Sequence, residues 1–164
     1  MLKLWMAPHG LHVEPAEHAD AEAIARLHAK GFYRGWPRED FAAYIAGLDT
    51  PIYVACDARR RIAGFAMLRL AADEAELITI AVDPKWRKKG VAMALMRAVL
   101  EDLRMTPARR LFLEVAADNS AALRLYRKLG FKEVSRLLIL ERIAAAKRAL
   151  PTQRVSGTGV DIQE

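Results

Sequence analysis

The residues best suited to chemistry lie in one short segment, where an apolar run passes into a basic loop and then into a helical pattern. Residues 80–82 end the apolar run, residues 87–89 are all basic, and Gly90 precedes the helix. The first turn of a helix has unpaired N–H groups and a partial positive charge, so phosphate oxygens bind there. The segment contains neither a GxGxxG dinucleotide loop nor the Gly-Lys-Ser/Thr of a P-loop. It predicts a site for a polyanion, the alternative being a helix that merely begins at a basic turn.

Three further motifs, taken together with this loop, resemble a known family. Arg87-x-x-Gly90-x-Ala92 resembles the Arg/Gln-x-x-Gly-x-Gly/Ala pyrophosphate loop of the GCN5-related N-acetyltransferases, the GNAT superfamily. The chain then continues with Leu113-Glu114-Val115, Asn119-Ser120-Ala121-Ala122 and Leu125-Tyr126-Arg127-Lys128-Leu129-Gly130-Phe131, which resemble the second half of that family. The match covers residues 12–136 and is closest to the RimI type, which acetylates the N-terminal alanine of a ribosomal protein.

The resemblance implies acetyl-CoA as co-substrate and a protein N-terminus, such as that of a ribosomal protein, as acceptor. It assigns a role to each matching residue. Cofactor contacts are implied for the backbone of Ile80, Ala81 and Val82 along the pantetheine arm, for the loop residue Arg87, for the amides of Lys88, Lys89, Gly90, Val91, Ala92 and Met93 at the pyrophosphate, and for the side chain of Asn119. Glu114 is implied as general base and Tyr126 as general acid.

The chemistry of acetyl transfer is compatible with these two roles. An α-amine has a pKa of about 8, so only about a tenth of it is neutral at pH 7 and a base must remove a proton. A tyrosine, with an ordinary pKa of about 10, stays protonated at neutral pH and can protonate the departing thiolate. The alternatives are that Glu114 is a strand-edge carboxylate and that Tyr126 is an aromatic packed between Leu123 and Leu129.

The elements that must position these residues follow from hydrophobic periodicity. Strands are expected at residues 12–15, 52–56, 62–70, 76–82, 110–115 and 131–134, and helices at residues 20–30, 36–48, 90–104 and 119–129. The second helix would carry Phe41, Tyr44, Ile45 and Leu48 as its apolar stripe, and the arginines of residues 57–61 would lie in a solvated hairpin turn. This order predicts an α/β or α+β fold, with a mixed central sheet covered by helices on both faces.

Three regions are expected along the chain: a loose leader at residues 1–11, the acetyltransferase domain at 12–140, and a divergent C-terminal helix and flexible tail at 141–164. After Arg136 the family pattern of arginines, paired tyrosines and a closing strand is not followed. Residues 143–150 are rich in alanine and favour a helix. The final strand is therefore expected to be missing or altered, which would affect the acceptor site more than the cofactor site.

Composition narrows the class of protein further. Among 164 residues, 26 are Lys or Arg and 20 are Asp or Glu, giving a net charge of +6. Such a balance suits an anionic cofactor, a ribosomal surface or nucleic acid. The single cysteine, Cys56, lies in an apolar run and is expected to be a small core residue, and no histidine has a partner at the spacing of a helical metal site, so no metal is expected. No apolar run approaches the ~18 residues of a membrane span, and a cytoplasmic protein is expected.

Three functions remain open from the sequence. The first is N-terminal acetylation of a protein. The second is acetylation of a different amine, such as a lysine side chain or a small metabolite. The third is a non-catalytic module that binds CoA or RNA through its basic surface.

Overall fold

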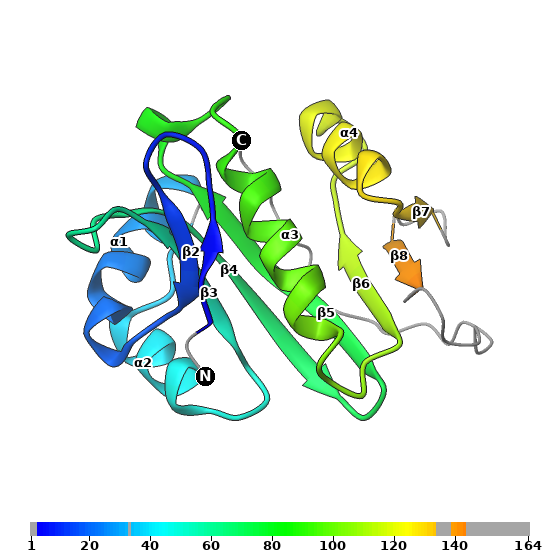
Figure 1. Ribbon diagram of the computed structural model, residues 1–164, viewed down its shortest axis with the longest axis horizontal. Coiled ribbons are helices and arrows are strands. Elements are labelled where there is room, and N and C mark those ends of the chain that lie inside the picture. The colour runs from blue at the N-terminus through cyan, green and yellow to red at the C-terminus, as the bar shows by residue number, and fades with distance from the viewer. Residues whose placement is uncertain (1–2, 33, 134–138, 144–164) are drawn as a thin grey trace.

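The computed structural model describes residues 3–32, 34–133 and 139–143 (Figure 1). Its elements, in chain order, are β1 (Trp5–Met6), β2 (His12–Pro15), the short 3-10 helix η1 (His18–Asp20), α1 (Ala21–Gly31), α2 (Arg38–Ala46), β3 (Ile52–Cys56), β4 (Ile62–Ala71), β5 (Glu74–Val82), the 3-10 helix η2 (Pro84–Trp86), α3 (Val91–Leu103), β6 (Arg110–Glu114), α4 (Ser120–Lys128), β7 (Lys132–Glu133) and β8 (Ile139–Ile143).

The strands form one mixed sheet in the order β1-β2-β3-β4-β5-β6-β8-β7. Strands β1 to β5 are joined by antiparallel pairing, β5 and β6 are parallel, and β8 pairs antiparallel with both β6 and β7. The parallel pair needs a crossover connection, and α3 supplies it. The fold is the mixed α/β sheet that the sequence predicted.

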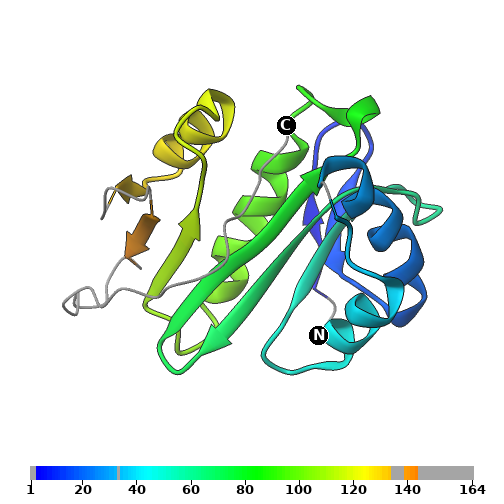
Figure 2. The ribbon, with the colours of Figure 1, turned by 180° about the vertical axis from the view of Figure 1, so that it is seen from behind.

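Helices cover both faces of the sheet. Figures 1 and 2 show α3 on one face and α1 with α2 on the other. Neighbouring positions of β5 alternate between the two cores: Ile80 and Val82 belong to the cluster under α3, whereas Ala81 belongs to the cluster under α1 and α2. Because β4 and β5 are buried on both sides, their sequences are nearly continuous apolar runs.

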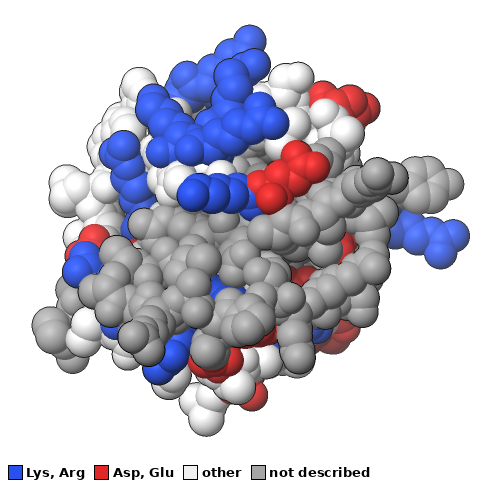
Figure 3. Space-filling model, turned by 90° about the vertical axis from the view of Figure 1, so that its right-hand side faces the viewer, with Lys and Arg blue, Asp and Glu red and all other residues white. Residues whose placement is uncertain are grey.

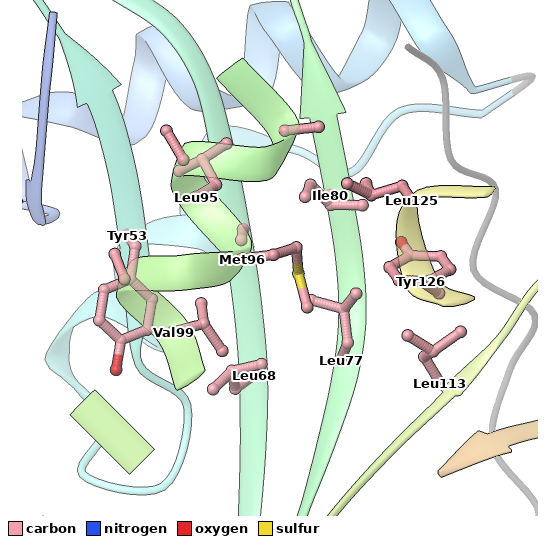
Figure 4. Close-up of a cluster of buried hydrophobic side chains, with 14 of the residues drawn as sticks. Tyr53, Leu68, Leu77, Ile80, Leu95, Met96, Val99, Leu113, Leu125 and Tyr126 are labelled. Carbon is pink, nitrogen blue, oxygen red and sulfur yellow. The ribbon is translucent and has the colours of Figure 1, made fainter. Parts of the chain in front are cut away.

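The core under α3 contains most of the apolar contacts that hold this helix to the sheet. Figure 4 shows Leu95, Met96 and Val99 of α3 beside Leu68 and Leu77 of the strands. These side chains recur at helical spacing and belong to a broad buried face of α3, while Arg97 and Glu101 on its other side remain exposed. Each fully buried aliphatic side chain contributes about 1.5–3 kcal/mol by leaving water. The packing therefore fixes α3, and with it the basic loop at its start.

The structure corrects three expectations. Residues 5–6, expected in a loose leader, form β1 and pair with β2. The final strand, expected to be missing or altered, is present as β8, and it pairs along the whole of β6, from Glu114↔Ile139 to Arg110↔Ile143. Leu48, assigned to the apolar stripe of the second helix, lies beyond the end of α2 and is 94% exposed.

Strand β8 also crosses the expected domain boundary between residues 140 and 141. The N–H and C=O groups of β6 provide the partners for this pairing. Only Ile143 of β8 belongs to the alanine-rich stretch that was expected to be helical. The rest of the expected C-terminal helix and tail, residues 144–164, lies outside the described residues. Within the described part, no helix has the length and apolar character needed to cross a membrane.

We expect the two leucines at positions 95 and 48 to differ sharply in their contribution to stability. Leu95 is 0% exposed and Leu48 is 94% exposed. Leu95→Ala should lower the free energy of unfolding by about 2–5 kcal/mol, the usual cost of a cavity in a core. Leu48→Ala, the same chemical change at the surface, should alter it by less than about 0.5 kcal/mol. Urea unfolding followed by circular dichroism measures both, and equal losses would contradict the packing described for α3.

Candidate functional site

The site begins where β5 and β6 separate. Their parallel register pairs residues 74–76 with residues 110–112 and ends there, whereas β4 pairs with β5 as far as Gly64↔Val82. Figures 1 and 2 both show β5 and β6 diverging from this short contact. In the described part of the chain, residues 77–82 therefore have a strand neighbour on one side only. Their backbone can pair with an extended ligand on the other side, as a strand would.

A bulge in β5 accompanies this separation. The register with β4 shifts so that Leu77 opposes Leu68 and Thr79 opposes Met67, which leaves Ile78 as the extra residue. A bulge bends a strand and increases its twist. The bulge lies two residues after Glu76, the last residue paired with β6, where the second half of β5 separates from β6.

The basic loop follows the end of β5. The Asp83 carboxylate accepts a hydrogen bond from the backbone N–H of Lys85 at 3.0 Å and closes the turn into η2. The ammonium of Lys30, from α1, lies 3.0 Å from the second oxygen of Asp83. Burial alone would raise the pKa of Asp83, but these two partners lower it below its ordinary value, so the carboxylate stays ionised. The loop is thus tied to α1 at its start.

Two residues of the loop have left-handed backbone conformations just before α3. Lys88 has φ 60° and Gly90 has φ 80°. Gly90 is the N-cap, and the first backbone bond of the helix runs from the N–H of Ala94 to the Gly90 carbonyl at 3.0 Å. The N–H groups of residues 91–93 lie before that bond, so they have no partner within the helix. This end of α3 supplies donors for an anion next to the open edge of β5.

Positive side chains surround these donors. Lys85, Lys88 and Lys89 are exposed, and Arg87 is half-buried. The Lys89 ammonium lies 5.2 Å from the centre of the Trp86 ring, a cation–π contact that orients it. Figure 3 shows the α4 side of the molecule, with Lys and Arg gathered at its upper end. Helix α4 carries the exposed basic residues Arg124, Arg127 and Lys128. The field at this end of the sheet favours a polyanion.

The structure places the two residues expected to move protons on neighbouring elements. Glu114 is the last residue of β6 and is half-buried. Tyr126 lies on α4, fully buried, with its ring 5.3 Å from that of Phe131 in an edge-to-face contact. Figure 4 shows Tyr126 in the same cluster as Ile80 of β5 and Leu113 of β6. Both residues therefore border the region in which β5 and β6 diverge.

Asn119 has a structural role in addition to the cofactor contact expected from the sequence. Its side-chain oxygen accepts a hydrogen bond from the N–H of Ala122 at 3.2 Å and caps α4. Such a cap typically stabilises a helix by about 1 kcal/mol. The position that was expected to contact the pantetheine arm thus also fixes the start of the helix that carries Tyr126.

An aromatic cluster lies on the face of the sheet that α1 and α2 cover, and the sequence did not predict that its members contact one another. The buried His28 ring stacks on Phe32 at 4.1 Å and lies 4.7 Å from Trp36 and 5.4 Å from Phe41. The backbone N–H of Trp36 donates to Nδ1 of His28 at 3.2 Å. Because burial strongly disfavours the imidazolium, the pKa of His28 falls to about 4. The signal available in sequence was a histidine on the apolar stripe of a helix, followed closely by Phe32 and Trp36.

The comparisons with known proteins agree on one family. The acetyltransferase (GNAT) family model matches residues 21–131. The N-alpha-acetyltransferase RimI of Mycobacterium tuberculosis is 33% identical over 145 residues, which are 85% of this chain and 89% of that protein. The ribosomal protein bS18-alanine N-acetyltransferase of Escherichia coli K12 is 40% identical over 75 residues, which are 46% of this chain. The match spans 51% of the Escherichia coli protein, so the chain covers about half the length of that relative.

Solved structures agree with this result. The ribosomal-protein-S18-alanine N-acetyltransferase of Escherichia coli has a TM-score of 0.74 at 27% identity, covering 87% of this chain and 99% of that one. Arabidopsis thaliana NAA60 in complex with acetyl-CoA has a TM-score of 0.72 at 22% identity, covering 81% and 98%, and shares the fold. The resemblance noted in the sequence is confirmed.

We expect His28 to make the protein less stable in mild acid. Its pKa is about 4 in the folded state against an ordinary 6.5, so only the unfolded chain binds a proton between these values. The stability conferred by the neutral ring is complete above pH 6.5 and declines as the pH falls towards 4, by at most about 1.4 kcal/mol per pH unit. Urea unfolding from pH 7 to pH 4.5 should show a shallower decline for His28→Gln than for the wild type.

A matched control separates this effect from other acid-sensitive groups. His18 is exposed, and His18→Gln should retain the wild-type dependence on pH. Identical slopes for the wild type and His28→Gln would show that burial does not keep His28 neutral.

Proposed function

Because the chain belongs to the GNAT family of acetyltransferases, we propose that it transfers the acetyl group of acetyl-CoA to the free N-terminal α-amine of a protein. The observation that carries the proposal is the early separation of β5 from β6, with the basic start of α3 at the far end of the open edge. The open edge suits an extended amide-bearing chain, and the basic end suits a pyrophosphate. A pantetheine arm joined to a diphosphate has both features in this order.

In this proposal the cofactor is held mainly by backbone. The pantetheine amides pair with the open edge of β5 at Ile80, Ala81 and Val82, with Asn119 on the facing side. The pyrophosphate accepts hydrogen bonds from the amides of residues 88–93, and Arg87 adds positive charge. Support comes from the left-handed conformations of Lys88 and Gly90, which turn the loop into α3 next to this edge.

Two side chains complete the reaction. The α-amine nitrogen attacks the thioester carbonyl carbon, the carbon–sulfur bond breaks, and an amide bond forms. Glu114 takes the proton that the nitrogen loses, directly or through water, and Tyr126 donates its proton to the departing sulfur. The positions of these residues beside the separation of β5 and β6 support the assignment, and a buried tyrosine is shielded from bulk water.

The acceptor we propose is a protein N-terminus, with the alanine N-terminus of a ribosomal protein as the first candidate. Two relatives support this choice by their names: one is a ribosomal protein bS18-alanine N-acetyltransferase and the other an N-alpha-acetyltransferase. The exposed basic residues of α4 and of the loop fit a negatively charged environment such as a ribosomal surface.

The catalytic assignment predicts a loss of turnover without a loss of cofactor binding. Free CoA would be measured with acetyl-CoA and a short peptide that begins with alanine. Glu114→Gln and Tyr126→Phe should each lower kcat by about 10²–10⁴-fold, the usual contribution of a positioned acid or base. Calorimetric affinity for acetyl-CoA should stay within a few fold of the wild type in both variants.

Two controls accompany this measurement. Glu101→Gln changes an exposed carboxylate of α3 and should leave turnover unchanged. A peptide with an acetylated N-terminus and an internal lysine should not react. Turnover of that blocked peptide would instead assign the enzyme to side-chain amines, and full activity of Glu114→Gln would remove the proposed base.

The cofactor assignment predicts that the backbone conformation of Gly90 is needed for acetyl-CoA binding. Gly90 and Gly10 both have left-handed backbone, with φ 80° and 72°. A Cβ at Gly90 would meet nothing closer than Pro8 at 3.5 Å, and one at Gly10 would meet nothing within 4 Å. Alanine at either position should therefore cost a similar stability of about 1 kcal/mol through strain.

Only the change at Gly90 should weaken acetyl-CoA binding. Gly90→Ala should raise the KM for acetyl-CoA about tenfold or more, since a hydrogen bond to a charged group contributes about 1.5 kcal/mol or more. Gly10→Ala should leave that KM unchanged. An equal KM for both variants would show that the start of α3 does not bind the pyrophosphate.

A further inference from the structure

Three metal-ligating side chains meet on β2 and β3, away from the separation of β5 and β6. His12 is the direct cross-strand partner of Cys56, and Glu14 lies two residues further along β2. Because side chains alternate along a strand, His12 and Glu14 project on one face, and Cys56 opposes His12 on that face. In the strand order, β4 separates this group from β5.

The three ligand atoms lie close together. Nε2 of His12 is 2.9 Å from Oε2 of Glu14 and 3.5 Å from Sγ of Cys56, and all three atoms lie within 4.8 Å of one another. Ligands at zinc distances of about 2.0–2.3 Å in a tetrahedron are separated by roughly 3.3–3.8 Å. The side chains therefore need only small adjustments around an ion. The rigid pairing of two strands holds them in this arrangement before any ion binds.

Charges around the group favour a cation. Arg60 forms ion pairs with Glu14 and, at 2.6 Å, with Asp20, and its Nε lies 3.6 Å from Glu17. The pair to Arg60 uses Oε1 of Glu14, so Oε2 faces His12. One guanidinium thus faces three carboxylates. Arg60 was expected to lie in a solvated turn, but it orients Glu14 for this group.

The same surroundings make the Cys56 thiol unsuitable as a nucleophile. Burial, together with the charges of Asp20, Asp57 and Glu17, raises the pKa of the Cys56 thiol to about 11. A bare thiolate is disfavoured there, as expected for a cysteine that is buried near negative charges. A divalent cation reverses this balance, because it replaces the thiol proton and is attracted by the carboxylates.

The group is also accessible. The side chains of His12 and Glu14 are 19% and 15% exposed, whereas Cys56 is buried. An ion can reach the nitrogen and oxygen from solvent, with the sulfur beneath them. Three protein ligands leave a fourth position of a tetrahedron for water.

We propose that His12, Glu14 and Cys56 form a Zn²⁺ site that joins β2 to β3. A nitrogen, an oxygen and a sulfur ligand form a set that zinc accepts and that calcium or magnesium, which bind oxygen, do not. The ion crosslinks strands near one edge of the sheet and stabilises their pairing. It takes no part in acetyl transfer.

Cobalt is the probe for this site, because Co²⁺ occupies zinc sites and absorbs light. The full-length chain, without a histidine tag and kept reduced, would be titrated with Co²⁺ and then with Zn²⁺. The wild type should bind one equivalent, with a sulfur-to-cobalt charge-transfer band in the near ultraviolet and the visible bands of four-coordinate cobalt. Zn²⁺ should abolish both sets of bands. Absence of a sulfur band at millimolar Co²⁺ would overturn the proposal.

Variants assign the bands to these residues. Cys56→Ser should lose the charge-transfer band, and His12→Gln and Glu14→Gln should each weaken Co²⁺ binding at least tenfold. His18→Gln, which changes an exposed histidine outside the group, should bind as the wild type does. Because His12 and Glu14 are partly exposed, their variants test the site even if the change at buried Cys56 impairs folding. A wild-type cobalt spectrum in Cys56→Ser or His12→Gln would overturn the assignment.

Thermal unfolding gives a second measurement. Zn²⁺ should raise the melting temperature of the wild type and of His18→Gln, since an ion that binds only the folded state stabilises it. It should not raise that of His12→Gln. Turnover of acetyl-CoA in the presence of a chelator should be the same as without one, and a loss would show that the metal serves the reaction instead.

Discussion

Strand β5 pairs with β4 along its whole length, whereas it pairs with β6 over three residues only. The site depends on this difference between the two edges of β5. Had the parallel ladder continued, the N–H and C=O groups of residues 77–82 would be occupied by β6. The bulge at Ile78 bends β5 just beyond the segment that it shares with β6, and the parallel ladder does not continue past this point. An open edge inside a sheet, rather than at its margin, results from this local irregularity.

The open edge is useful only because the elements around it are rigid. Burial of one stripe of α3 against β4 and β5 fixes the helix, and the ion pair between Lys30 and Asp83 ties the loop to α1 on the other face. The donors at the start of α3 are therefore presented at a constant distance from the edge of β5. Preorganised backbone donors bind an anion without the entropic cost of ordering a flexible loop.

Three polar side chains, those of His28, Cys56 and Arg60, acquire their properties from the neighbours that packing gives them. His28 is neutral because an aromatic cluster excludes water from it. Burial, together with the charges of nearby carboxylates, raises the pKa of the Cys56 thiol and makes it a poor nucleophile, and the same carboxylates attract a cation. The side chain of Arg60 is half-buried, and three acidic side chains converge on it.

Much of the fold could be predicted from periodicity. The apolar runs of β3, β4 and β5 and the stripe of α3 were evident, since each buried face repeats with the period of its element. The short strands were harder: β1 has only two residues, and β8 follows a sequence that departs from the family pattern. Such strands owe their existence to a neighbouring backbone and have no periodicity of their own.

For the site, the sequence by itself determined the chemical components. It specified the basic loop with its glycine, the carboxylate at the end of an apolar strand, and the tyrosine of the following helix, because each of these features consists of residues that are close together in the chain. The tertiary structure decided which groups meet. The divergence of β5 from β6, the second role of Asn119 as a helix cap, and the approach of Cys56 to His12 across 44 residues all depend on pairing between distant segments. Register and burial set these encounters, and neither can be derived from local sequence.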